Sequence, residues 1–453
     1  MPPTFALPAR PALRPQRISV PMFKVPMFKV PIFAATLLAA TLLSGCSAPT
    51  VRDGSTPASS AGTPADDAQT LDLRVVTFNV SLYDEAAGGL IRRLEAGDDG
   101  ARRAAAVLQR LRPDIVLLNE FDYDPDGRAA ELFQRGYLEQ PQAGGGEALR
   151  YPYRYAAPVN TGVPSGLDLD GDGQVGGTGR ARGNDAWGYG LHPGQYGMLV
   201  LSRWPIDMDA VRSFRLLRWS AMPDASAPVD PQARRMFYPD PVWRQLRLSS
   251  KTHLDVPVRT PAGTVHALVS HPTPPVFDGP EDRNGARNAD EIRLWTDYLD
   301  NEPADRAWLC DDAGRCGGLQ ADAAFVILGD LNNDPVDGDG RHDAIRALLA
   351  HPRVLQAPAP RSAGAVEAAR LSGGANAAHT GDPAEDTGDF GPRVGNLRLD
   401  YAIPSRRFGL RGSGVFWPVA GEADAALLAA SDHRAVWIDL QLSKPAAVGA
   451  TTR

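Results

Sequence analysis

The chain has 453 residues, of which 43% are hydrophobic and 22% are charged, as is usual for a globular protein. Its formal net charge is −7, and removal of residues 1–45, which hold five basic residues and no acid, leaves −12 (−7 − 5). A protein this acidic is repelled by nucleic-acid backbones unless its basic side chains cluster, so the composition disfavours a nonspecific nucleic-acid binder.

Residues 1–45 predict a signal peptide, because basic residues precede an uncharged stretch over 32–45. This stretch is shorter than the ~20 residues of a membrane-spanning helix. Residues 43–46 (LSGC) resemble the lipobox of bacterial lipoproteins, in which the cysteine, here Cys46, is acylated. We therefore expect an exported protein that is lipid-anchored, at the outer membrane or cell surface. The alternative is an ordinary secretory signal that ends beside a cysteine.

Residues 46–70 are rich in Ser, Pro and Ala and hold no aromatic residue, which predicts a flexible linker. We interpret residues 71–441 as one enlarged domain, because the polar motifs described below run from one end of it to the other. Residues 442–453 are then a C-terminal tail, and we expect a monomer. Cys310 and Cys316 flank a turn-forming segment, so in an exported chain they predict a disulfide, with free thiols as the alternative.

Along this domain, strand-like and helix-like segments alternate. An amphipathic helix is predicted over 288–299, and residues 90–111 also carry apolar side chains at helical spacing. Short apolar runs predict strands over 71–80, 115–119, 198–201, 265–270, 325–328, 397–403 and 435–440. Strands bounded by turn signals, with helices between them, predict an α/β sandwich.

Polar side chains follow several of these apolar runs. Because side chains of a strand alternate and strand ends can share one rim of a sheet, these groups can converge on one site. They are Asn79, Glu120, His271, Asp330, Asn332, Asp400, Asp432 and His433.

The order and wording of these motifs (TFNV, VLLNE, LVSHPT, GDLNND, LDY and SDH) resemble the endonuclease/exonuclease/phosphatase superfamily, which has the fold of pancreatic-type deoxyribonucleases. The resemblance covers roughly residues 71–440. It implies a four-layer α/β/β/α sandwich in which two mixed β-sheets pack face to face, with the active site at one rim. It also implies a divalent ion, Mg²⁺ or Mn²⁺.

The resemblance assigns a role to each motif residue. Glu120 is expected to bind the metal, with Asn79 and Asp432 beside it, and magnesium does prefer such hard oxygen ligands. Asp330 would position or deprotonate the attacking water, and Asn332 would donate to the scissile phosphate. Without the resemblance, Asn79 is equally typical of a strand-ending turn, and the D-x-N pattern of Asp330 and Asn332 is typical of an Asx-turn.

Two histidines complete the expected site. His271 and His433 are matched to the pair that flanks the phosphate, where an imidazole with a pKa near ~6.5 can donate to phosphoryl oxygens or protonate a leaving group. The resemblance places Asp400 where it orients His433.

Two further features lie outside the shared motifs. Arg283 and Arg287, four residues apart, are expected to bind a second phosphate of the substrate, or else to form surface salt bridges. Residues 168–173 (DLDGDG) match the first half of a calcium loop, so a structural Ca²⁺ is expected, completed by another acid such as Asp185; a solvated acidic turn is the alternative. The acids concerned are Asp168, Asp170 and Asp172.

These observations predict a metal-dependent phosphodiesterase or phosphomonoesterase that acts outside the cytoplasm by attack of water on phosphorus. An extracellular nuclease is the second interpretation. It is disfavoured because the chain has no long Lys/Arg run or aromatic-interleaved basic patch. A non-catalytic exported binding lipoprotein is the third.

Overall fold

The computed structural model describes residues 70–443. The predicted signal peptide, almost all of the linker and Cys46, the predicted acylation site, lie outside the described residues, as does the tail beyond Ser443. Among the described residues, no helix is both long and apolar enough to cross a membrane.

Two mixed sheets form the centre of the molecule. The first sheet has six strands in the order β14-β15-β1-β2-β4-β3, and only β1 and β2 are parallel. Its strands are β1 (Thr70–Leu82), β2 (Ile115–Phe121), β3 (Tyr153–Ala156), β4 (Met198–Ser202), β14 (Phe408–Val415) and β15 (Val436–Ser443). The second sheet has five strands in the order β13-β10-β9-β8-β5, and only β9 and β10 are parallel. Its strands are β5 (Arg212–Ser213), β8 (His253–Thr260), β9 (Gly263–Ser270), β10 (Ala324–Asp330) and β13 (Asp400–Pro404).

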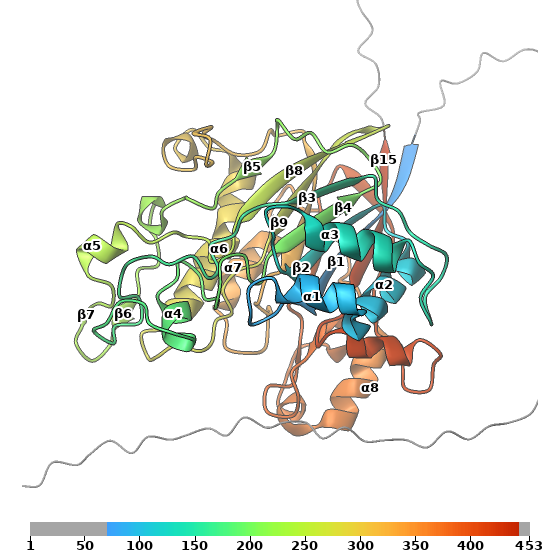
Figure 1. Cartoon of the computed structure of the whole chain (residues 1–453). Helices are drawn as coiled ribbons and strands as arrows, with labels where there is room; N and C mark the ends of the chain where they lie inside the picture. The colour runs from blue at the N-terminus through green and yellow to red at the C-terminus, as the bar shows by residue number, and fades with distance from the viewer. Residues whose placement is uncertain (1–69, 444–453) are drawn as a thin grey trace, which may run out of the picture. The chain divides into compact units, whose positions relative to one another are not determined.

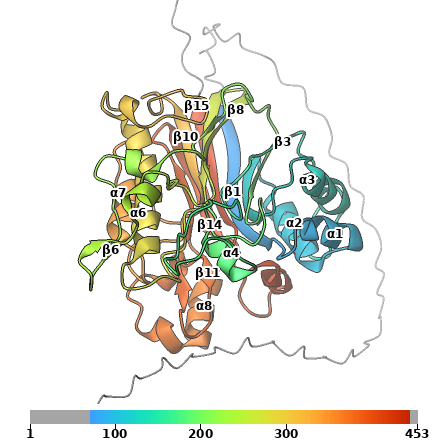
Figure 2. The ribbon, with the colours of Figure 1, turned by 60° about the vertical axis from the view of Figure 1, so that its left-hand side comes forward.

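Helices cover the outer face of each sheet. Figure 2 shows α1, α2 and α3 on one side of the two sheets and α6 and α7 on the other. Figure 1 labels these elements, with α8 at one end of the sheets. The helices are α1 (Gly89–Ala96), α2 (Asp99–Leu111), α3 (Arg128–Phe133), α4 (Arg180–Asn184), α5 (Asp240–Trp243), α6 (Arg283–Asp300), α7 (His342–Leu349) and α8 (Ala363–Ser372). Two small ribbons, β6 (Val229–Asp230) with β7 (Arg235–Met236) and β11 (Gly388–Asp389) with β12 (Asn396–Leu397), complete the set.

Three apolar clusters hold the four layers together. Along β1 successive side chains point to opposite faces, so Val75 packs between the sheets while Val76 packs under α1 and α2. The third cluster lies between the second sheet and α6, where Trp295 and Tyr298 are fully buried. Burial of each such large side chain contributes about 1.5–3 kcal/mol. The predicted fold class, a four-layer α/β/β/α sandwich with two packed mixed sheets, is confirmed.

Several element boundaries differ from the sequence prediction. The helical stretch 90–111 is two helices, because Gly97 leaves α1 at φ 90° and Asp98 caps α2 by accepting from the amide of Ala101. The predicted strand 397–403 is also divided: residue 397 ends β12, and residues 400–403 belong to β13. The strands β8 and β14 were not predicted, and β15 runs to Ser443.

Cys310 and Cys316 form a disulfide that closes a short hairpin.

Candidate active site

The motif residues come together where strands of both sheets end. Glu120 is the second-last residue of β2, and His271 directly follows β9. Asp330 ends β10 and lies opposite Asp400, the first residue of the antiparallel β13. His433 lies on the segment that leads into β15. The fold therefore collects side chains that are more than three hundred residues apart in the sequence.

Two buried asparagines connect the sheets at this rim. The side-chain amide of Asn79 donates to Asp330 Oδ2 at 3.1 Å. The side chain of Asn119 donates to the carbonyl of Ser270 at 3.3 Å and accepts from the amide of Asp330 at 3.2 Å. Asn119 precedes Glu120 in the VLLNE motif, yet the sequence prediction gave it no role. These contacts fix how the end of β2 lies relative to β9 and β10.

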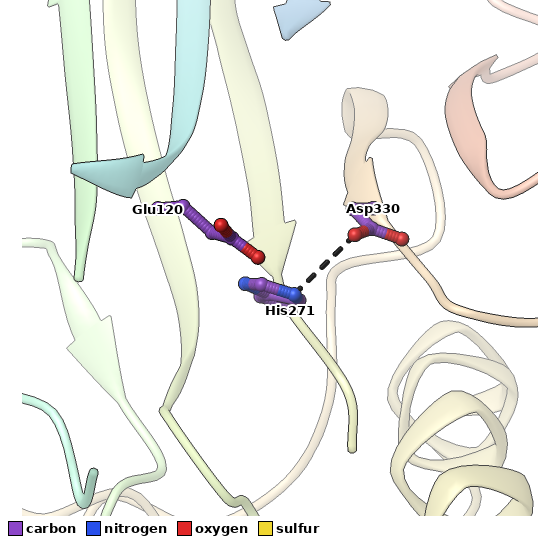
Figure 3. Close-up of side chains that lie close together, drawn as sticks. All are labelled: Glu120, His271 and Asp330. Carbon is purple, nitrogen blue, oxygen red and sulfur yellow. Dashed lines mark ion pairs between the residues drawn. The ribbon is translucent and has the colours of Figure 1, made fainter. Parts of the chain in front are cut away.

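Glu120, His271 and Asp330 form the innermost group. One ligand atom from each of them lies within 4.8 Å of those of the other two. Figure 3 shows the His271 ring between the two carboxyl groups, with the His271 Nε2 to Asp330 Oδ2 contact of 3.4 Å drawn as a dashed line. The same oxygen, Asp330 Oδ2, thus accepts from Asn79 and contacts His271.

Glu120 and Asn332 both have left-handed backbone conformations, at φ 56° and 52°. Such a conformation is costly for a non-glycine residue and is found chiefly at functional sites, where the surroundings hold it. For Asn332 the holding contacts are its amide, which donates to Asp330 Oδ1 at 3.0 Å, and its side chain, which donates to the Pro272 carbonyl at 3.1 Å. The Asx-turn is therefore present, and Asn332 also lines the cavity.

His433 and Asp400 form a buried ion pair beside this group. The Nδ1 of His433 donates to Asp400 Oδ2 at 2.8 Å, and Thr387 Oγ1 donates to the same oxygen at 2.8 Å. The other ring nitrogen, Nε2, lies 3.6 Å from Asp330 Oδ2. Burial alone would lower the pKa of His433, but the charges of Asp400 and Asp330 outweigh it and raise that pKa well above its usual value. His433 is therefore a cation at neutral pH.

His271 has the opposite character. Burial, reinforced by the nearby charge of Lys251, lowers the pKa of His271 to about 4. Burial alone would raise the pKa of Asp330, but the charge of His433 and the contact with His271 outweigh it and hold that pKa well below its usual range. At neutral pH the site thus holds one neutral imidazole, one imidazolium and an ionised Asp330.

Lys251 and Glu291 belong to the site but were not found from the sequence. Lys251 is buried, and within residues 70–443 the one acceptor of its amine is the Pro272 carbonyl, at 3.4 Å. Glu291 of α6 is fully buried, and its two oxygens accept the amides of Ser250 and Thr273, each at 2.6 Å. Glu291 therefore holds both the segment before β8, which carries Lys251, and the segment after β9, which carries His271.

A cavity of about 540 Å³ is lined by Glu120, Lys251, His271, Asp330 and His433, but not by Asp400 or Glu291. Asp432 lines it but is exposed, and its Oδ1 accepts from Ser81 Oγ at 3.3 Å. Its carboxylate is not part of the group formed by Glu120, His271 and Asp330. Asn79 is buried behind Asp330 and is not among the residues that line the cavity.

Arg283 and Arg287 also line the cavity, although both guanidinium groups already have partners. Arg283 pairs with Glu281 and lies over the ring of Phe237. Arg287 donates to the backbone carbonyls of residues 187, 247 and 248 at 2.7–2.9 Å. Arg287 thus connects α6 to the neighbouring loops, which is a structural role that the spacing of the two arginines did not indicate.

The predicted calcium residues lie on a neighbouring loop. Asp168 and Asp170 come within 4.8 Å of Asp185, the acid expected to complete the set, whereas Asp172 lies outside this group. Their oxygens accept amides of the same loop: Asp168 accepts from residues 171 and 173, and Asp185 accepts from residues 169 and 176. Calcium at this loop stays a prediction.

The donor set fits a hard divalent cation. Burial raises the pKa of Glu120 to about 7, because the charged carboxylate is desolvated. A cation bound beside it would offset the free-energy cost of burying that charge. Glu120 and Asp330 provide the oxygen ligands that Mg²⁺ and Mn²⁺ prefer, and one or two carboxylates are the usual number for magnesium. These residues could therefore hold the metal.

Comparison with known proteins agrees with this geometry. The model of the endonuclease/exonuclease/phosphatase family matches residues 76–433, and the chain belongs to this family. Members of the family are hydrolases that act on phosphoesters. No curated protein matches the sequence.

Solved structures of the same kind are distant in sequence. An endonuclease/exonuclease/phosphatase from Beutenbergia cavernae is 19% identical, with 82% of this chain and 72% of that one covered and a TM-score of 0.43. Sphingomyelinase C from Streptomyces griseocarneus is 17% identical, with 82% and 99% covered and a TM-score of 0.40. A beta toxin mutant from Staphylococcus aureus with bound magnesium ions is 13% identical, with 83% and 100% covered and a TM-score of 0.38.

Proposed function

We propose that this protein hydrolyses small phosphoesters with the help of a divalent metal. The observation that carries the proposal is the meeting of two carboxylates, a neutral histidine and a charged histidine in the lining of one cavity. A phosphoester is anionic, so its hydrolysis requires both an activated water and compensation of the charge on the phosphoryl oxygens. The cavity supplies groups for both tasks.

Each side chain has a distinct part in this proposal. Glu120 and Asp330 would hold Mg²⁺ or Mn²⁺, which when bound neutralises phosphoryl charge and favours the deprotonation of water. Asp330, which stays ionised, accepts a hydrogen bond from the attacking water and so positions it. His433 donates a hydrogen bond to a phosphoryl oxygen or a proton to the leaving group, and Asp400 keeps its Nε2–H directed into the cavity.

Lys251 would support this chemistry in its charged form: burial lowers the pKa of its amine, while the nearby carboxylates favour the charged form. Its amine is buried near the two carboxylates, where a charge acts more strongly than it does in water. A phosphate that enters the cavity could accept hydrogen bonds from the Lys251 amine, which makes one long hydrogen bond, of 3.4 Å, to the Pro272 carbonyl. His271, neutral at pH 7, can donate to the phosphate or accept from water without adding charge.

The test is hydrolysis by the full chain of bis-p-nitrophenyl phosphate, p-nitrophenyl phosphate, phospholipid vesicles and plasmid DNA, with Mg²⁺ and with EDTA. We expect cleavage of the small esters or lipids that EDTA abolishes, and its loss in His433→Ala. His379→Ala, which changes a histidine outside the cavity, is the matched control. Nicking of DNA would favour the nuclease, and inactivity on every substrate would favour a binding lipoprotein.

We also propose that the enzyme works outside the cytoplasm, tethered through Cys46. The support is the signal-like sequence of residues 1–45 together with the Cys310–Cys316 disulfide, since disulfides persist in oxidising compartments. Metabolic labelling with a radioactive fatty acid tests this: label should enter the membrane-bound protein and be absent from Cys46→Ala. Equal labelling of both would refute the anchor.

A further inference from the structure

The cavity is also lined by side chains that take no part in the proposed reaction. Five of its lining residues are aromatic; Tyr238 is buried, and the four that are at least partly exposed are Tyr83, Tyr189, Tyr196 and Phe277. The rings of Tyr83 and Tyr196 are 4.6 Å apart between centroids, with their planes tilted by 52°. Phe277 is 78% exposed and Tyr189 is 45% exposed. Much of this aromatic surface is therefore left uncovered by the protein's own core.

Backbone strain gathers around the same cavity. In the described part of the chain ten non-glycine residues have positive φ, and five of them line the cavity. These five are Ser81, Glu120, Tyr196, Phe277 and Asn332. The two aromatic residues among the ten are Tyr196 at φ 57° and Phe277 at φ 68°. For bulky side chains this conformation is rare, and such residues concentrate at functional sites.

Polar contacts hold the two strained aromatic residues in place. The side chain of Asn284 donates to the Val276 carbonyl at 2.7 Å, and its amide donates to Asp278 Oδ2 at 2.6 Å. The residues before and after Phe277 are thus tied to the start of α6. The amide of Tyr196 itself donates to Asp122 Oδ1 at 3.1 Å. The exposure of Phe277 is consequently a fixed feature of the loop.

We propose that these four aromatic side chains, the aromatic subsite, bind the organic group of the phosphoester, and that this group is an aromatic or similarly flat apolar ring. The proposal rests on the proposed function, because the aromatic subsite shares one cavity with the reaction groups. Rings pack against rings in offset or edge-to-face contacts that an alkyl group cannot make. The volume of about 540 Å³ is that of a small-molecule pocket, with room for a phosphate and a ring together.

Non-hydrolysable phosphonates test this without turnover. Isothermal titration of the full chain in Mg²⁺ would compare phenylphosphonate, cyclohexylphosphonate and methylphosphonate, which share one headgroup. We expect phenylphosphonate to bind about tenfold more tightly than methylphosphonate, with the cyclohexyl compound between them. Phe277→Ala and Phe277→Leu should reduce the preference for phenyl several-fold and leave the methylphosphonate affinity unchanged.

Leu371→Ala is the matched control, because Leu371 is also highly exposed (63%) but lies at the end of α8, outside the cavity. It should retain the full preference for phenyl. Equal affinity for the three phosphonates, or an unaltered preference in both Phe277 variants, would overturn the aromatic subsite alone. Failure of methylphosphonate and inorganic phosphate to bind at all would overturn the proposed function together with it.

Discussion

Replacement of Glu291 by Gln should weaken both the fold and the reaction, although residue 291 does not line the cavity. The two carboxylate oxygens each accept a backbone amide at 2.6 Å, from Ser250 and from Thr273. An amide side chain offers one oxygen and one NH₂, so one of the two buried N–H groups would face a donor in the variant. The change also removes the negative charge that most favours the charged form of buried Lys251.

The expected cost follows from these contacts. A hydrogen bond to a charged group contributes about 1.5–3 kcal/mol, so loss of one should lower the free energy of unfolding by about 2–3 kcal/mol. Urea unfolding of the wild type, Glu291→Gln, Lys251→Met and the double variant would measure this and the coupling between the two charges. The Lys251 amine and the Glu291 carboxylate interact through their charges without a direct ion pair. We therefore expect a moderate coupling energy of about 1–2 kcal/mol between the two substitutions. Lys251→Met alone should lower kcat/KM about 100-fold.

Asp290→Asn provides the matched control. This neighbouring acid of α6 is also buried, but it accepts from Trp219 and Ser226 rather than from the strand-end segments. It should cost stability without any coupling to Lys251→Met. Glu291 does not have this role if Glu291→Gln unfolds like the wild type, or if the double variant is additive within about 0.5 kcal/mol.

Three further predictions concern other groups of the site and core. Asp400→Asn should lower kcat by about 100-fold or more and lower the pKa of His433, read by NMR titration; an unmoved pKa would contradict the pairing. Burial lowers the pKa of His253 to about 4, so between that pH and ~6.5 the folded state binds fewer protons and stability falls as pH falls, by about 2 kcal/mol from pH 7 to 5. Urea unfolding at both pH values should show a smaller loss in His253→Gln. Glu120→Gln should weaken Mn²⁺ binding, followed by paramagnetic resonance, without destabilising the metal-free protein, because burial already disfavours its charged form.

The fold could be predicted from the sequence because its layers are encoded in local patterns. Apolar runs of strand length, such as residues 115–119 and 325–328, became buried central strands. By contrast β8, with Asp255 and Pro257 inside it, and β14, with three glycines, do not have the composition of strands. Their pairing partners, β9 and β15, stabilise them, and such tertiary contacts are not visible in a local window.

The same distinction applies to the site. Residues that end apolar runs, such as His271 and Asp330, could be found because the position itself is unusual for a polar group. Lys251 and Glu291 gave no such signal: Lys251 stands in a polar segment, and Glu291 falls on a helix whose charged residues are ordinarily solvated. Both are buried by contacts with segments distant in the sequence, which a local window does not show.

The position of the site between two sheets explains why buried polar ties are needed there. The apolar cluster between the sheets resists their separation, but hydrophobic contacts are not directional and tolerate sliding of one layer over the other. A reaction centre that takes Glu120 from one sheet and Asp330 from the other tolerates much less, since a displacement of about 1 Å can cost two orders of magnitude in rate. The hydrogen bonds from Asn79 to Asp330, and between Asn119 and both β9 and β10, are directional and cross from one sheet to the other. These hydrogen bonds fix the position of one sheet relative to the other, which the apolar contacts alone do not. The geometry of the reaction groups therefore depends on how the two sheets are joined.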